Sequence, residues 1–295
     1  MFDQIFGRYL VKREYLTVEQ LEEVIAYESS VRVKLGLIAV TEKLMTQEQA
    51  DEVNQLQTVM DKRFGDIAVM QGYLTEEQVM HLLKKQDDIY MLFCQTLIDK
   101  GYMTLEEVDQ ALNEYQAEEG FTHSDMDDLV SGDVDRIVRI FLPTNSELNN
   151  RLCGIVIRTV IRVIDSGAYV SKSYLTDQLI MDNFAMQKLD GDHKIATGFA
   201  GLNKDLLAIA DVFAKEEFPE VDLDALDAVG EFTNCVNGLF ASELSNENVS
   251  VDMLPPEYYE SPVTIKGKEF CVLPVHIGEK SVNFVLSIDS EFSVE

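Results

Sequence analysis

The stretch Asp224–Leu244, "DALDAVGEFTNCVNGLFASEL", predicts a long amphipathic helix in the second half of this 295-residue chain. At about 100° per residue, its large apolar side chains gather on one face. Asp227, Glu231 and Asn234 fall within roughly 60° of one another on the opposite face, so we expect all three to point away from the core. A polar trio of this kind is either a solvated helix face or a working surface.

The segments around this helix predict the rest of its domain. Residues 146–167 and 203–218 have the pattern of amphipathic helices. Short turns at Lys266–Lys268 and Gly278–Lys280 predict antiparallel hairpins. Because helices and strands cluster instead of alternating, we expect an α+β fold with long helices packed on an antiparallel sheet. The expected strands are residues 168–175, 193–201, 249–254, 263–277 and 280–288.

The beginning of the chain carries a repeat with a period of 29 residues. "YLTVEQL" from Tyr15 is followed by "LMTQEQA" from Leu44, "YLTEEQV" from Tyr73 and "YMTLEEV" from Tyr102. Each copy places a Thr three residues before a Gln or Glu, the capping-box pattern of a helix start. A second apolar segment precedes each cap, so we expect four helix-turn-helix copies stacked in an all-α module. The capping pairs are Thr17 and Gln20, Thr46 and Gln49, Thr75 and Gln78, and Thr104 and Glu107.

Composition sets the domain boundaries and excludes several classes of function. The helical module is expected over 1–120, an acidic linker over 121–135 and the second domain over 136–295. A net charge of −29 disfavours nucleic acid and anionic membrane surfaces. No apolar run reaches the roughly 20 residues of a membrane span, and the start lacks a signal peptide, so we expect a cytoplasmic protein. Cysteines and histidines are scattered, which predicts no metal site.

The trio also has the spacing of a known signature. Asp227, Glu231 and Asn234 spell [DS]xxxExxN, and the small residue Gly238 follows. This resembles the CheC, CheX and FliY phosphatases of bacterial chemotaxis, and the resemblance extends from about 136 to 288. A single helix of this type is closer to CheX than to CheC. The shorter ExxN triplet recurs at Glu147 with Asn150 and at Glu243 with Asn246, without the preceding Asp or Ser.

The resemblance implies an enzyme, a hydrolase that removes the aspartyl phosphate of a CheY-like response regulator. It implies that Asn234 orients the attacking water and that Glu231 pairs with the regulator's lysine. Gly238 would belong to the docking surface, and Asp227 would shape that surface or hold the helix start. The regulator carries its own Mg²⁺, so no cofactor is expected on this chain, and a homodimer is compatible with the family. The alternatives are a non-catalytic scaffold that docks a regulator and a merely solvated helix face.

The second and third copies of the repeat suggest a second resemblance. "KLGLIAVTEKLMTQEQADEVNQLQ" from Lys34 and "RFGDIAVMQGYLTEEQVMHLLKKQ" from Arg63 are separated by five residues. They resemble the N-terminal domain of MshE-type secretion and pilus ATPases, which implies cyclic di-GMP as a ligand. Lys34 and Lys43 depart from the Arg and Gly of the pattern, and a helical module that recruits signalling or secretion partners is the alternative. The matching residues are Leu35, Gly36 and Gln57, then Arg63, Gly65, Asp66, Gly72, Leu74, Leu83 and Gln86.

Overall fold

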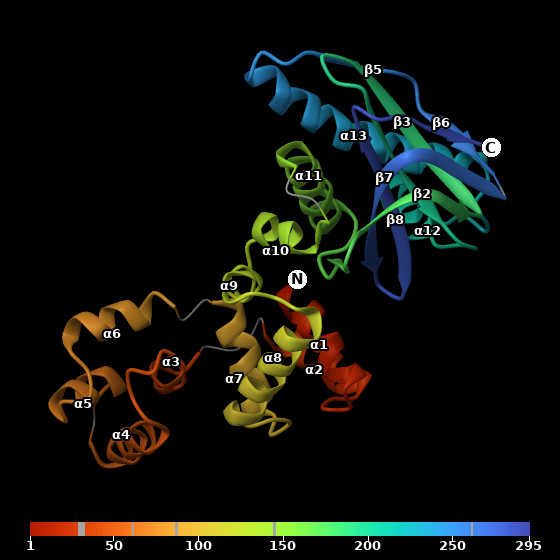
Figure 1. The fold of residues 1–295 in the computed structure, drawn as a ribbon. Coiled ribbons are helices and arrows are strands. Elements are labelled where there is room, and N and C mark those ends of the chain that lie inside the picture. Colours follow the sequence, from red (N-terminus) through yellow and green to blue (C-terminus); the bar gives the residue numbers. More distant parts are fainter. Residues whose placement is uncertain (29–32, 61, 86–87, 144–145, 261) are drawn as a thin grey trace. The chain divides into compact units, whose positions relative to one another are not determined.

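The computed structural model describes residues 1–28, 33–60, 62–85, 88–143, 146–260 and 262–295. They form two compact units that divide between Gly132 and Asp133 (Figure 1). The first unit is helical, and the second combines helices with an antiparallel sheet, so the predicted fold class is confirmed. The range 121–135, expected as a linker, contains a helix, His123–Val130, whose start is capped by Thr122.

Capping residues decide where several helices of the first unit begin. Thr46, Thr75 and Thr104 each accept a hydrogen bond from the backbone N–H three residues on, and the side chain at that position accepts one in return. The same two bonds join Thr17 and Gln20. The predicted capping boxes are therefore confirmed. The helices of this unit are α1 (Phe2–Lys12), α2 (Val18–Glu28), α3 (Leu35–Thr41), α4 (Gln47–Val59), α5 (Phe64–Met70), α6 (Glu76–Leu83), α7 (Ile89–Asp99), α8 (Leu105–Glu119) and α9 (His123–Val130).

The four copies of the repeat pack as two pairs and not in sequence order. α1 and α2 of the first copy pack against α7 and α8 of the fourth, and α3 and α4 of the second pack against α5 and α6 of the third (Figure 1). Tyr73 of the third copy donates to Glu52 of the second at 2.6 Å, and Tyr102 of the fourth donates to Glu23 of the first. The helical module therefore consists of two pairs of copies, the first with the fourth and the second with the third.

The second unit is built around one antiparallel sheet. The main strand order is β1-β7-β8-β4-β3-β5, while β2 and β9 also pair with β7 and β6 pairs with β3. The long helices α11 and α13 and the 8-residue helices α10 and α12 accompany it. The elements are α10 (Val134–Phe141), α11 (Glu147–Val163), β1 (Tyr169–Val170), β2 (Tyr174–Met181), β3 (Asn183–Gly191), β4 (Ile195–Gly201), α12 (Leu207–Ala214), α13 (Leu223–Asn246), β5 (Val251–Met253), β6 (Glu257–Tyr259), β7 (Val263–Ile277), β8 (Lys280–Ile288) and β9 (Phe292–Val294).

The sheet buries apolar side chains on both faces. α13 packs on β3 and β4, α11 contacts β8, and the rings of Phe199 and Phe232 lie 5.7 Å apart in this layer. On the other face the curled sheet closes over a second cluster that includes Phe184, Val285 and Phe292. The central strands are thus covered on both sides, which places α13 directly on the sheet.

Two expectations about the strands are wrong, each for a physical reason. We expected no strand at 183–191, where β3 lies, because its first residues are buried on both faces and show no polar alternation. The turn expected at Lys266–Lys268 is the interior of β7. Gly267 is needed there for close approach, since a Cβ would lie 3.0 Å from the Cβ of Phe292. The hairpin predicted at Gly278–Lys280 is confirmed by the pairing of β7 with β8.

Candidate functional site

The helix α13 carries the predicted trio on a rigid element of 24 residues. Asp222 caps its start, accepting a hydrogen bond from the backbone N–H of Ala225 at 3.0 Å. Val229, Phe232 and Val236 are buried against the sheet, as the helical period predicts. The buried apolar face therefore fixes the rotation of α13 about its axis, and with it the direction in which the trio faces.

The three members of the trio differ in exposure. Asp227 and Glu231 are exposed, whereas Asn234 is half-buried. The expectation that all three point away from the core is wrong for Asn234, because its Oδ1 accepts a hydrogen bond from Nε2 of Gln187 on β3 at 2.8 Å. Asn234 thus lies at the boundary between the helix–sheet layer and the surface.

Asp227 is held by an aromatic side chain from β6. The hydroxyl of Tyr258 donates to Oδ1 of Asp227 at 2.8 Å. Burial, this hydrogen bond and the negative charges of Asp227 and Glu231 raise the pKa of Tyr258. Because Asp222 caps the helix, the expected role of Asp227 at the helix start is wrong. Its role in docking stays a prediction.

Within the part of the chain that the structure describes, Glu231 has no hydrogen bond and no ion pair. It lines a cavity of about 360 Å³ between α12 and α13, together with Phe213, Phe218 and Asp224. A carboxylate in this position is available to a cationic side chain of a partner, because charge-assisted hydrogen bonds are the stronger ones.

The two glycines beside the trio have different surroundings. A Cβ at Gly230 would lie 2.5 Å from Cε1 of Tyr258, so glycine there lets the tyrosine ring lie over the helix. A Cβ at Gly238 would meet only Met253, at 3.8 Å. Gly238 also lines a groove of about 420 Å³ with Cys235 and Leu239. Packing within the unit therefore explains Gly230, whereas Gly238 leaves the helix surface open.

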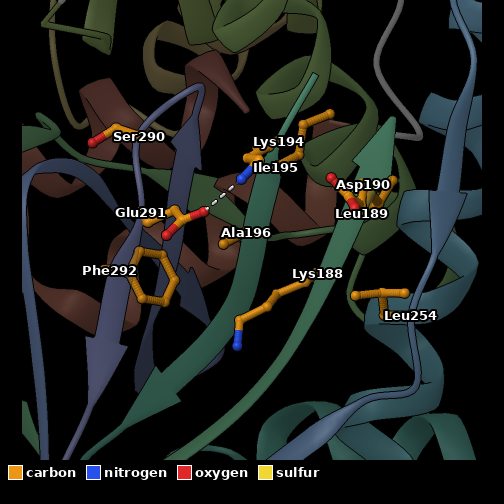
Figure 2. A pocket seen from close by; sticks show the side chains of 10 residues that line it. All are labelled: Lys188, Leu189, Asp190, Lys194, Ile195, Ala196, Leu254, Ser290, Glu291 and Phe292. Carbon is orange, nitrogen blue, oxygen red and sulfur yellow. Dashed lines mark hydrogen bonds and ion pairs between the residues drawn. The ribbon is translucent and has the colours of Figure 1, made fainter. Parts of the chain in front are cut away.

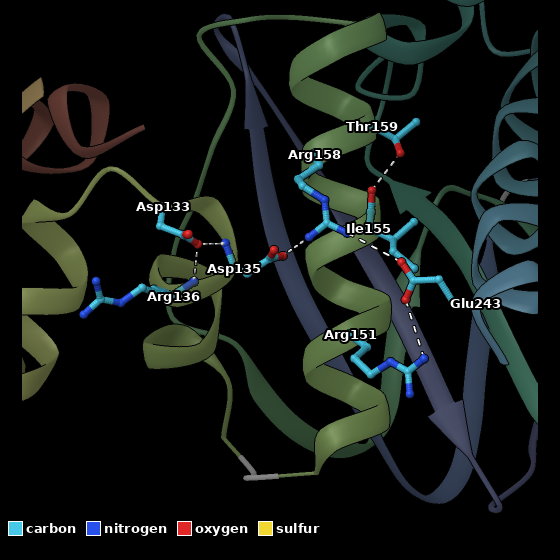
Figure 3. Close-up of polar contacts among 8 residues, drawn as sticks. All are labelled: Asp133, Asp135, Arg136, Arg151, Ile155, Arg158, Thr159 and Glu243. Atoms are coloured by element: carbon cyan, nitrogen blue, oxygen red, sulfur yellow. Dashed lines mark hydrogen bonds and ion pairs between the residues drawn. The ribbon is translucent and has the colours of Figure 1, made fainter. Parts of the chain in front are cut away.

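The two other ExxN triplets belong to a cluster of arginines and carboxylates. Glu243 lies 3.6 Å from Arg151 and 4.0 Å from Arg158, and Arg158 also pairs with Asp135 (Figure 3). Glu147 and Asn150 line a cavity of about 480 Å³ that these ion-paired side chains also border. These contacts tie α10, α11 and the end of α13 together. Among the described residues Glu243 is therefore ion-paired, whereas Glu147, like Glu231, has no hydrogen bond or ion pair.

A further pocket of about 280 Å³ lies away from the trio, at the ends of β3 and β4 (Figure 2). Lys194 pairs with Glu291 at 3.1 Å across it, and Lys188, which also lines it, pairs with Glu257 at 2.8 Å. Both lysines are thus neutralised by carboxylates of the same unit.

Sequence reasoning missed Gln187 and Tyr258, which contact the trio from β3 and β6. They lie 47 and 31 residues from their partners Asn234 and Asp227, so no local spacing connects them. One signal was available for Gln187: its amide directly follows the apolar run "FAM" of residues 184–186.

Two of the glycines that match the nucleotide motif, Gly36 and Gly65, are packing positions, whereas Gly72 lies in a turn with a positive φ of 74° and has open space around it. A Cβ at Gly36 would lie 3.1 Å from the ring of Phe64, and one at Gly65 would lie 2.7 Å from Val79. Both are buried. Their small size lets neighbouring helices of the second and third copies approach closely, whether or not a ligand binds.

Four of the other nucleotide candidates come from α3, α4 and the start of α5. Arg63 and Asp66 are exposed at the start of α5, and Leu35 is half-buried in α3. Gln57 is exposed, and its side chain donates to the backbone carbonyl of Lys62 at 3.3 Å. Gln86 lies outside the described residues. A nucleotide site formed by these residues stays a prediction.

The described ranges contain neither a cluster of metal ligands nor a membrane-spanning helix. Among those residues, no group of three or more His, Cys, Asp or Glu side chains is arranged to hold a metal ion. Within the same ranges, no helix has the length and apolar character needed to cross a membrane.

Comparison with known families places the trio in a recognised segment. Residues 184–276 match the family model of the chemotaxis phosphatase CheX. The matched segment runs from β3 into β7 and contains Asp227, Glu231 and Asn234 as well as Gln187 and Tyr258. The match covers less than half of the chain and lies in its C-terminal half, which is CheX-like over these residues. No curated protein matches the chain at a significant level.

Several solved structures are similar to about half of this chain. The chemotaxis protein CheX from Vibrio vulnificus is 16% identical with a TM-score of 0.43, and covers 48% of this chain and 99% of its own. A CheC-like superfamily protein from Shewanella sp. PV-4 is 17% identical with a TM-score of 0.42, covering 49% and 99%. The CheX–CheY–BeF3–Mg²⁺ complex from Borrelia burgdorferi is 15% identical with a TM-score of 0.37, covering 48% and 97%.

Proposed function

We propose that this protein is a phosphatase that hydrolyses the aspartyl phosphate of a CheY-like response regulator. In this reaction a water molecule attacks phosphorus and the bond between phosphorus and the aspartyl oxygen breaks. Inorganic phosphate is released, and the aspartate of the regulator becomes a free carboxylate. Phosphoryl transfer has a loose transition state, so positioning and charge neutralisation supply most of the catalysis. The Mg²⁺ belongs to the regulator, and the residues of this chain bind no cofactor in the proposal.

The observation that carries the proposal is the fixed amide of Asn234 one turn from the unpaired carboxylate of Glu231. A hydrogen bond from Gln187 occupies one lone pair of its Oδ1, and no described residue accepts a hydrogen bond from its Nδ2. Asn234 therefore offers N–H donors and one oxygen lone pair with which to orient a water in line with the scissile bond. A purely docking helix has no need for such an amide.

The residues around Asn234 have supporting roles in the proposal. Glu231 pairs with the lysine of the regulator's active site and sets the direction in which α13 enters it. Asp227, already bonded to Tyr258, is a fixed negative charge on the docking surface. Gly238 allows close approach because a Cβ there would meet only Met253, at the ordinary contact distance of 3.8 Å. The net charge of −29 favours a regulator with a basic rim.

For the first unit we propose a module that binds a signalling or secretion partner. The buried positions of Gly36 and Gly65 support a scaffold that needs small residues for its own packing. Cyclic di-GMP is the ligand to test first, by calorimetric titration of the full-length protein. Binding that is lost in Arg63→Ala would make this unit a nucleotide sensor, and absence of binding would leave the partner module.

The test of the proposed function is the decay of phosphoryl label from a panel of the host's Mg²⁺-loaded response regulators. We expect wild-type protein to accelerate the decay of one regulator, and Asn234→Ala to abolish the acceleration while binding persists. Asn246→Ala is the matched control, because Asn246 ends another ExxN triplet of the same helix and is exposed. It should retain wild-type activity.

Two outcomes would refute the proposal. Acceleration that survives in Asn234→Ala would remove the water-orienting role of the amide. Binding of a regulator without any acceleration by wild-type protein would instead identify a non-catalytic scaffold.

A further inference from the structure

Behind Asn234, polar side chains form a hydrogen-bonded chain through the helix–sheet layer. Thr197 on β4 donates from Oγ1 to Oδ1 of Asn237 at 3.0 Å. Asn237 on α13 donates from Nδ2 to Oε1 of Gln187 at 2.8 Å. Gln187 on β3 then donates from Nε2 to Oδ1 of Asn234 at 2.8 Å. Three elements of the fold therefore meet in one chain that ends at Asn234.

The three residues behind Asn234 are among the most deeply buried polar side chains of the unit. Gln187 is 1% exposed, and Thr197 and Asn237 are fully buried. Buried polar groups destabilise a fold unless they are hydrogen-bonded, and a fully paired network specifies one arrangement. The pairing is close to complete here, because the remaining donor capacity of Gln187 is used by the backbone carbonyl of Leu254 at 2.9 Å.

The hydrogen-bonded chain of side chains also has a direction. A side-chain amide has a donor end and an acceptor end, and the backbone carbonyl of Leu254 can only accept, so the nitrogen of Gln187 faces it and the oxygen of Gln187 faces Asn237. Asn237 then presents its nitrogen to Gln187, and Gln187 presents its nitrogen to Asn234. The carbonyl of Asn234 is thereby turned toward the sheet, so its Nδ2 lies at the opposite end of the amide.

We propose that Gln187 is a positioning residue for Asn234, and that Asn237 and Thr197 hold Gln187 in the required orientation. This inference rests on the proposed phosphatase function. A side chain on the surface of a helix samples several rotamers, and water-orienting catalysis needs one of them. The buried chain selects that rotamer before the regulator arrives. Displacement of a catalytic group by about 1 Å can cost about 100-fold in rate.

The kinetic test uses Gln187→Met, which keeps side-chain length and removes both ends of the amide. We expect kcat for dephosphorylation to fall about 10- to 100-fold while KM stays within about twofold, because the docking surface is unchanged. In an Asn234→Ala background, where binding persists without acceleration, Gln187→Met should leave the affinity for the regulator unchanged, since it acts through Asn234. A merely structural residue would weaken binding in that background as well.

A milder pair of variants guards against misfolding. Thr197→Val removes the first donor of the chain with little change of shape, and Thr159→Val removes a buried hydroxyl that bonds only within α11, to the carbonyl of Ile155 at 2.7 Å. Both substitutions should lower the free energy of unfolding by similar amounts. Only Thr197→Val should lower kcat and shift the side-chain amide signals of Asn234 in the ¹⁵N spectrum of the free protein.

The outcomes separate this inference from the function on which it rests. If wild-type protein accelerates no regulator, the proposed function fails, and the positioning role fails with it. If wild-type protein is active and Gln187→Met or Thr197→Val keeps a wild-type kcat, the positioning role alone is overturned. Equal loss of kcat in Thr197→Val and Thr159→Val would also overturn it.

Discussion

The contrasting surroundings of Gly230 and Gly238 lead to a paired prediction for Gly→Ala substitutions on α13. Alanine is favoured over glycine inside a helix by about 1 kcal/mol. At Gly238 the new Cβ would meet Met253 at 3.8 Å, an ordinary contact. We therefore expect Gly238→Ala to raise the free energy of unfolding of residues 133–295 by about 1 kcal/mol.

At Gly230 the same gain is opposed by a clash. The new Cβ would lie 2.5 Å from Cε1 of Tyr258, where carbon atoms prefer about 3.5–4.0 Å, so the ring must move by about 1 Å. That shift breaks its 2.8 Å hydrogen bond to Asp227, and overpacking typically costs about 1–3 kcal/mol. We expect Gly230→Ala to be destabilising by about 1 kcal/mol, which places the two variants about 2 kcal/mol apart.

Hydrogen exchange at the amides of β4 measures this difference for the correct unit, because every residue of β4 is buried in the sheet. In thermal unfolding, about 2 kcal/mol corresponds to about 4–8 °C for a domain of this size. Tyr258→Phe is the control that removes the hydrogen bond without adding atoms. Equal stabilisation by Gly230→Ala and Gly238→Ala would refute the placement of Tyr258 over the helix. A lower kcat/KM in Gly238→Ala would further support close approach of the regulator there.

Three further predictions concern other parts of the chain. Of the four cysteines, only exposed Cys235 should react with a thiol reagent in the native protein. Burial raises the pKa of the other three thiols, to about 12 for Cys94, to about 11 for Cys271 and well above the usual value for Cys153. Mass spectrometry locates the adduct, and the reagent should inhibit wild-type protein but not Cys235→Ser. Hydrogen bonds from Lys188 and, to a lesser extent, Tyr259 lower the pKa of Glu257 in the folded protein. The ionised carboxylate therefore stabilises the fold above its unfolded-state pKa of about 4.3, and this contribution is lost as the pH falls through the folded-state pKa. The free energy of unfolding in urea, measured between pH 3 and 6, should depend less on pH in Glu257→Gln. Thr104→Ala should cost about 1 kcal/mol by removing the cap of α8, and faster exchange at the Glu107 amide, with α6 amides unchanged, would show it.

Local patterns predicted much of the helical structure. The Thr-to-Gln/Glu spacing of the repeat located four helix starts, because a capping box needs only residues of one turn. The pairing of the first copy with the fourth was not predictable in this way. It depends on which apolar faces fit together, and every copy has a similar face.

The strands were harder to predict where both faces are buried. β3 lacks the polar alternation that marks a half-exposed strand, since α13 covers one face and the curled sheet covers the other. Gly267 looked like a turn residue, but it lies inside β7 where β9 approaches closely. In both places tertiary packing determined the conformation against the local signal.

The sequence by itself determined α13, its buried face and the one-turn spacing of Asp227, Glu231 and Asn234, because the helical period alone sets these relations. Only the tertiary structure decided how each member is held. Gln187 reaches Asn234 from β3, Tyr258 reaches Asp227 from β6, and Glu231 is left unpaired among the described residues. These contacts join positions far apart in the chain, so they exist only once the sheet has formed beneath the helix.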